Sequence, residues 1–89
     1  MRRVIWKYPL TARAAFTLEM PEGRFEFLSV QMQNGEPCMW ALVNPTQRKV
    51  PHAFRVVPTG EEFEKTDNLH YLGTFQPLNG LVFHLFEQL

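Results

Sequence analysis

The side chains best suited to binding chemistry in this sequence lie around one tryptophan. The pairing expected across Asn34-Gly35 sets Trp40 opposite Ser29 and on the same strand face as Gln31. A tryptophan beside hydroxyl and amide groups can stack a nucleobase or anchor a protein partner. The alternative is a core tryptophan whose ring N–H is satisfied by Gln31 or by a backbone carbonyl.

Four other polar or aromatic side chains, on three further predicted strands, complete the set of candidate binding residues: Arg55, Tyr71, His84 and Glu87. Arg55 has apolar neighbours on both sides. It therefore lies either on the outer face of a strand or in a site that recognises a carboxylate or phosphate. The pairing expected across Asn79-Gly80 sets His84 opposite Phe75, on the face that also carries Tyr71 and Phe86.

Catalytic and metal-binding motifs are not found. The sequence has no GxSxG, Walker, HExxH or CxxC motif. Its single cysteine, Cys38, excludes an internal disulfide framework and suits a reducing cytoplasm, and we expect a small buried thiol in a strand. His52, His70 and His84 fall in three different predicted strands without ligand spacing. We therefore predict no metal site, no cofactor and no enzymatic activity.

Short apolar segments separated by proline and glycine predict an all-β fold. The chain has 89 residues, seven prolines and five glycines, which suits one domain over 1–89 with little room for helices. We expect a small antiparallel meander forming a sandwich or partly closed barrel. Its six or seven strands fall at about 3–10, 13–20, 25–33, 37–44, 50–57, 69–76 and 81–88.

Two Asn-Gly pairs predict tight hairpins, because both residues tolerate the positive φ of a type I′ turn. Across Asn34-Gly35 the expected register gives a core face with Leu28 and Met39, and a β-bulge near 27–28. The segments 38–43 and 81–86 are apolar on both faces. Such strands are central, or their second face meets another surface, and so we expect a homo-oligomer.

The charge balance narrows the classes of partner. Nine Lys+Arg against nine Asp+Glu give a net charge of zero, which disfavours sequence-specific nucleic-acid binding and acidic DNA mimicry. Residues 1–60 nevertheless carry eight basic and four acidic side chains, and residues 61–89 carry one and five. Because no segment reaches the length of a membrane span, we expect no membrane association.

Several strings resemble one family of small proteins encoded by tailed bacteriophages and prophages. They are IWKYPL, FLSVQMQNGEPCMWALVNP, FRVVPTG and YLGTFQPLNGLVFHLFE, and together they cover nearly the whole chain. The resemblance implies action in the host bacterial cytoplasm but carries no established biochemical role. The residues that match this family include Trp40, Arg55, His84 and Glu87. A structural role explains these four residues less readily than it explains the matching glycines.

The sequence therefore favours a non-enzymatic phage accessory protein that binds and neutralises a host defence factor. It could contact a host protein directly through aromatic anchors. It could instead sequester a small nucleotide between subunits, with Trp40 stacking on the base and Arg55 on phosphate. The alternative function is a structural protein associated with the virion or with replication.

Overall fold

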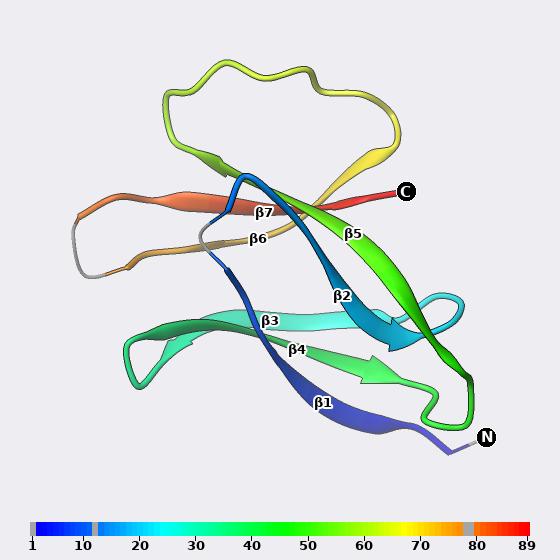
Figure 1. The fold of residues 1–89 in the computed structure, drawn as a ribbon. Helices are drawn as coiled ribbons and strands as arrows, with labels where there is room; N and C mark the ends of the chain where they lie inside the picture. The colour runs from blue at the N-terminus through cyan, green and yellow to red at the C-terminus, as the bar shows by residue number, and fades with distance from the viewer. Residues whose placement is uncertain (1, 12, 78–79) are drawn as a thin grey trace.

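The computed structural model describes residues 2–11, 13–77 and 80–89, and it confirms an all-β fold. Seven strands form two antiparallel sheets that pack as a sandwich and do not close into a barrel (Figure 1). The strands are β1 (Val4–Pro9), β2 (Ala15–Pro21), β3 (Glu26–Gln33), β4 (Glu36–Val43), β5 (Lys49–Pro58), β6 (Leu69–Phe75) and β7 (Phe83–Gln88). The predicted strands all exist, with ends that shift by one or two residues.

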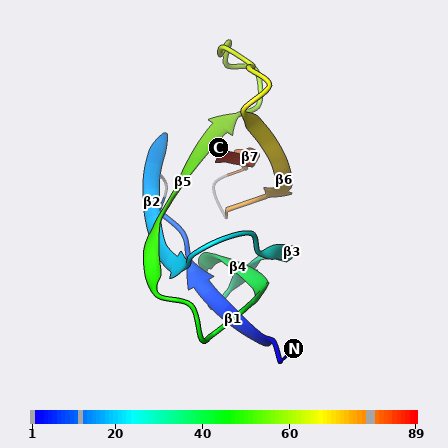
Figure 2. The same ribbon diagram turned by 90° about the vertical axis from the view of Figure 1, so that its right-hand side faces the viewer.

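The strand order differs from a simple meander. Sheet A has the order β1-β4-β3, and sheet B has the order β2-β5-β7-β6. The chain therefore crosses between sheets after β1, β2 and β4, so β1 and β2 are sequence neighbours without being paired. Turned by 90°, the molecule shows sheet A below sheet B (Figure 2). The pairs β1–β4 and β2–β5 join distant segments, which alternation along a single strand cannot identify.

The hairpin between β3 and β4 has the predicted turn and register. Asn34 and Gly35 have φ of 52° and 81°, as a type I′ turn requires. Ser29 lies opposite Trp40, and the register shifts between Phe27 and Ser29 through the expected β-bulge. The bulge residue Leu28 is 41% exposed, so its placement in the core was wrong. The extra residue in the bulge gives the inward position to Phe27 instead.

The hairpin between β6 and β7 departs from the prediction by one residue. Asn79 lies outside the described residues, so the turn itself is not described. Thr74 lies opposite His84, whereas Phe75 pairs with Phe83. The connection runs from 76 to 82, and a second bulge lies between Tyr71 and Gly73. A two-residue turn would have fixed the register, and this longer connection does not.

The inner faces of both sheets form the main core. Its fully buried large side chains include Met39 of sheet A and Met20, Phe54 and Leu85 of sheet B. Gly73 of β6 lies against β3, where an added Cβ would come within 2.7 Å of the Val30 Cγ1 atom. The missing side chain therefore allows the edge strands β3 and β6 to approach closely.

The other two edge strands are β1 and β2. Each of them ends in a proline, Pro9 in β1 and Pro21 in β2. A proline has no backbone N–H to donate to a further strand, so both edges lose a donor at that end.

Candidate binding surfaces

Trp40 lies on the outer face of sheet A and not in the core. Its neighbours in sequence, Met39 and Ala41, point inward and are fully buried, whereas Trp40 is partly exposed. Across the ladder it lies opposite Ser29 on one side and Lys7 on the other. The three predicted residues Trp40, Ser29 and Gln31 are therefore neighbours on this face.

The polar groups beside Trp40 bond to one another. The Gln31 amide donates a hydrogen bond to the Ser29 hydroxyl at 2.9 Å, and among the described residues it does not accept one from the indole N–H, as the core alternative had proposed. The Lys7 ammonium donates to the Gln33 side-chain carbonyl at 2.9 Å, and this bond joins the two edge strands across β4. These bonds hold the polar side chains around the tryptophan in place.

An apolar strip crosses the outer face of sheet A. We define it by Ile5 on β1, Trp40 and Leu42 on β4, and Leu28 on β3. Ile5 lies opposite Leu42, and it is 57% exposed. No strand lies on the side of sheet A that faces away from sheet B (Figures 1 and 2). Contiguous exposed apolar side chains with a polar border are typical of a protein interaction surface.

The border of the strip carries separated charges. Arg3 and Lys7 lie on the β1 side, and Glu26 lies opposite Leu42 on the β3 side. At one end Arg3, Arg24, Glu26 and Leu42 line a shallow depression. Neither Arg3 nor Lys7 makes an ion pair within the described part of the chain. The β1 side of the strip is therefore free to meet an acidic surface.

The outer face of sheet B is different because the chain itself covers it. Phe86 lies there, between Arg55 on β5 and Tyr71 on β6. The Phe63 ring of the 59–68 connection packs against Phe86 at a centroid distance of 5.5 Å. Phe86 is consequently only 7% exposed, and with Val57 and Leu69 it forms a small second core.

A chain of hydrogen bonds links Tyr71 to His84 on this same face. The Tyr71 hydroxyl contacts Thr74 Oγ1 at 2.5 Å, and Thr74 Oγ1 contacts His84 Nδ1 at 2.9 Å. His84 Nε2 contacts Thr59 Oγ1 at 2.7 Å, and the Thr59 hydroxyl also donates to the Val82 carbonyl. Every member has a partner when His84 is neutral with its proton on Nε2. These hydrogen bonds thus hold the start of the 59–68 connection against β6 and β7.

Arg55 borders a shallow, mostly apolar depression between β2 and β5, lined also by Ala15, Thr17 and Gln88. It makes no ion pair with any described residue, so its guanidinium remains available. Because Arg55 is on the outer face of sheet B and Trp40 is on the outer face of sheet A, the two face opposite sides of one chain. A single ligand that touches both must therefore lie between two copies.

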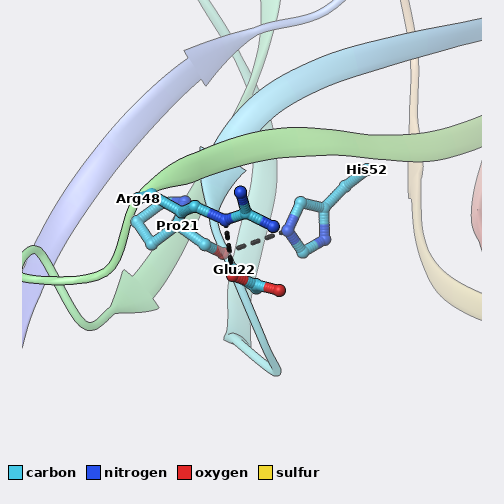
Figure 3. Close-up of polar contacts among 4 residues, drawn as sticks. All are labelled: Pro21, Glu22, Arg48 and His52. Atoms are coloured by element: carbon cyan, nitrogen blue, oxygen red, sulfur yellow. Dashed lines mark hydrogen bonds and ion pairs between the residues drawn. The ribbon is translucent and has the colours of Figure 1, made fainter.

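Glu87 faces inward, away from the other predicted residues, and lies beside His52. Their side chains are 17% and 11% exposed, and Glu87 Oε2 is 3.8 Å from His52 Nδ1. His52 Nε2 is 3.0 Å from the Pro21 carbonyl oxygen (Figure 3). The Phe25 ring packs edge-on against the His52 imidazole, with the two ring centroids 5.7 Å apart.

The His52–Glu87 pair was missed in the sequence analysis, although strand alternation contains the signal. His52 shares its parity with the inward residues Phe54 and Val56, and Glu87 shares its parity with inward Leu85. Both side chains could therefore have been assigned to the space between the sheets. Their contact depends on the pairing of β5 with β7, which alternation does not reveal.

The remaining chemistry-bearing side chains are dispersed. Cys38 is buried with a free thiol, as predicted. His52 points between the sheets, His84 points outward, and His70 is exposed on β6. Within residues 2–11, 13–77 and 80–89, no group of three His, Cys, Asp or Glu could hold a metal ion. The described chain also has no helix long and apolar enough to span a membrane.

A family model described as a domain of unknown function, DUF7352, matches residues 1–89, which is the entire sequence. The chain belongs to the DUF7352 family. No curated protein and no solved structure matches it. The DUF7352 description carries no activity.

Proposed function

We propose that this DUF7352 domain is a non-enzymatic binding protein whose apolar strip contacts a partner protein. The observation that carries the proposal is the exposure of the strip on one side of the sandwich. Ile5 and Leu28 are 57% and 41% exposed, and they flank Trp40 and Leu42. Burying such side chains removes apolar surface from water, and tryptophan is a frequent hot-spot residue.

The charges beside the strip define the chemistry of the partner. Arg3 and Lys7 border the strip on the β1 side, and neither has an ion-pair partner among the described residues. A complementary surface would carry apolar side chains at its centre and carboxylates on the side that meets β1. Such rim charges mainly raise the association rate and specificity.

The resemblance to phage-encoded proteins supplies the class of partner. We propose that the domain acts in a host bacterial cytoplasm and neutralises a host protein, namely a component of a defence system. A surface that blocks another protein by occupancy needs no catalytic group, which agrees with the dispersed histidines and the buried thiol.

Direct protein contact is favoured over nucleotide sequestration. Trp40 and Arg55 face opposite sides of one chain, so they can act on one nucleotide only where two copies meet. The strip, by contrast, is contiguous on a single copy and needs no partner residue to complete it.

The test compares three variants of the tagged protein expressed in bacterial cells. Trp40→Ala and Leu28→Glu change the strip, and Thr17→Glu is the matched control on an exposed position of sheet B. A protein captured by the wild type is identified, purified and titrated calorimetrically against each variant. We expect at least about a tenfold weaker binding, or about 1.4 kcal/mol, for the two strip variants and wild-type binding for Thr17→Glu.

Three results would overturn the proposal. The first is equal affinity of the captured protein for wild type, Trp40→Ala and Leu28→Glu. The other two come from native mass spectrometry of the purified protein. A retained nucleotide would favour sequestration, and a dimer that Leu28→Glu converts to monomer would assign the strip to a second copy of this chain.

A further inference from the structure

A pocket at one end of the sandwich contains two charged groups that do not pair with each other. It is lined by Gly23, Arg24 and Phe25 after β2, by His52 of β5, and by Glu87 and Leu89 at the end of the chain. Its volume is about 260 Å³. Sites for drug-sized ligands start at about 300 Å³, so this pocket suits a smaller molecule.

The Glu87 carboxylate lacks a good donor. Its side chain is 17% exposed, and its one ion-pair contact among the described residues is His52 Nδ1 at 3.8 Å, beyond hydrogen-bond distance. His52 Nε2 is directed at the Pro21 carbonyl, which can only accept (Figure 3). Nε2 therefore carries a proton, and in the neutral imidazole the Nδ1 lone pair faces Glu87. Two acceptors then face each other across a gap.

An ammonium group fits this gap because it supplies three donors and a positive charge. It could donate to the Glu87 carboxylate and to His52 Nδ1 together. Glu87 is largely buried, so a charge-assisted hydrogen bond from the ammonium would be screened little by water.

Arg24 supplies the opposite charge on the same pocket. It is exposed and makes no ion pair with the described residues, because neither the Arg48–Glu22 pair nor the 3.8 Å contact between His52 and Glu87 involves it. A simple amine would be repelled by this guanidinium. A ligand that also carries a carboxylate would instead gain a bond of the kind arginine forms well. The same pocket is also lined by Phe25 and Leu89, which offer apolar contact.

We propose that this pocket binds a small zwitterion of the α-amino acid class that has an apolar side chain. Its ammonium lies between Glu87 and His52, its carboxylate meets Arg24, and its side chain contacts Phe25 and Leu89. This site is separate from the apolar strip and goes beyond the protein-binding function proposed above.

The test uses three matched probes in ¹H–¹⁵N NMR titrations of the full chain. L-Leucine has both charges, isopentylamine has the ammonium alone, and 4-methylpentanoate has the carboxylate alone. We expect saturable shifts for residues around the pocket with leucine, and at least about tenfold weaker binding of either single-charge probe.

The variants assign each charge to its residue. Glu87→Gln should weaken leucine and isopentylamine about tenfold and strengthen 4-methylpentanoate, which no longer meets a like charge. Arg24→Gln should weaken the binding of leucine, which loses the partner of its carboxylate. It should strengthen the binding of isopentylamine, which no longer meets a like charge, so that 4-methylpentanoate binds no better than isopentylamine. The control Arg48→Gln removes a nearby guanidinium that does not line the pocket, and it should leave all three probes unchanged. Arg24 is exposed, so its substitution keeps the test valid even if Glu87→Gln fails to fold.

The proposal is overturned if leucine causes no saturable shift in the wild type, or if isopentylamine binds as well as leucine and Arg24→Gln has no effect. Trp40→Ala should bind leucine like the wild type. Failure of this site and failure of the apolar strip are therefore distinguishable.

Discussion

The outer faces of the two sheets start from the same sequence pattern and end differently. Strands β4 and β7 each carry apolar side chains on both their inner and outer sides. On sheet B, the connection after β5 folds back and places Phe63 on Phe86, which is then 7% exposed. On sheet A, Trp40 and Leu42 stay partly exposed next to Ile5 and Leu28.

An apolar outer face can therefore be covered by another segment of the same chain, as in sheet B, or left exposed to bind another molecule, as in sheet A. The connection that covers sheet B also carries much of the negative charge, at Glu61, Glu62, Glu64 and Asp67. It lies on the far side of the molecule from sheet A (Figure 1). The basic residues beside β1 are therefore not neutralised by it.

The largest expected effect tests the two faces directly. Phe86→Ala should lower the free energy of unfolding by about 3–4 kcal/mol, because it empties a buried site. Trp40→Ala should lower it by only about 1–2 kcal/mol, because the indole is already partly hydrated. Urea denaturation of both variants measures the difference. Equal losses would mean that Trp40 is a core residue.

A smaller effect isolates the covering connection. Phe63→Ala should cost about 1–2 kcal/mol, since Phe63 is 37% exposed but shields the second core. Phe63→Leu, which keeps an apolar cover, should recover most of that loss in thermal unfolding. A fully neutral Phe63→Ala would show that the connection does not stabilise sheet B.

Only the inner face of sheet A is packed against another sheet. An unsatisfied polar group on that face should therefore lower the free energy of unfolding measurably. The Tyr8 hydroxyl is buried there without a hydrogen-bond partner among the described residues. Replacing it by Tyr8→Phe removes an unsatisfied polar group, and we expect the free energy of unfolding to rise by about 1 kcal/mol. Urea denaturation at pH 7 measures this gain, and a loss of stability would indicate that the hydroxyl is satisfied.

The same residue predicts an alkaline signature. Burial raises the pKa of Tyr8 above its ordinary value near 10. Above pH 10 the unfolded chain therefore releases this proton more readily than the folded chain, and stability falls as the pH rises. The fall attributable to Tyr8 is at most about 1.4 kcal/mol per pH unit, and it should be absent in Tyr8→Phe.

The smallest expected effect on stability is at an exposed ion pair that joins the residue after β2 to the residue before β5. Arg48 donates to Glu22 at 2.9 Å, and this bond lowers the pKa of the Glu22 carboxyl (Figure 3). Any stability from the pair is present above the ordinary carboxyl pKa and is lost as the pH falls through the lowered value. Because both side chains are exposed, Arg48→Gln should leave the urea midpoint at pH 7 nearly unchanged. A large shift would indicate a role in positioning the turn before Arg24.

The sequence predicted those features that depend on residues close together along the chain, namely the strands and the β3–β4 hairpin. Alternation located the strands, and Asn34-Gly35 fixed the register that brings Trp40 beside Ser29. It failed where an extra residue or a long connection changes the phase, as at Leu28 and in the β6–β7 pairing.

The candidate sites depended on long-range pairing and were predicted only in part. Trp40, Ser29 and Gln31 were correctly grouped because one tight turn joins their strands. Arg55 and Tyr71 lie on opposite sides of Phe86 because β5 and β6 both pair with β7, and Glu87 lies beside His52 because β5 pairs with β7. Nothing within either strand encodes that choice of neighbour.

The prolines that end β1 and β2 also limit how copies of this domain can add to one another. Growth of a fibril by strand addition needs long edges with regular backbone donors and acceptors. The β3 and β6 edges already lie against each other at Gly73, and the other two edges each end without a donor. Association is thereby directed to the broad faces of the sandwich, where side chains and not backbone groups decide which molecule binds.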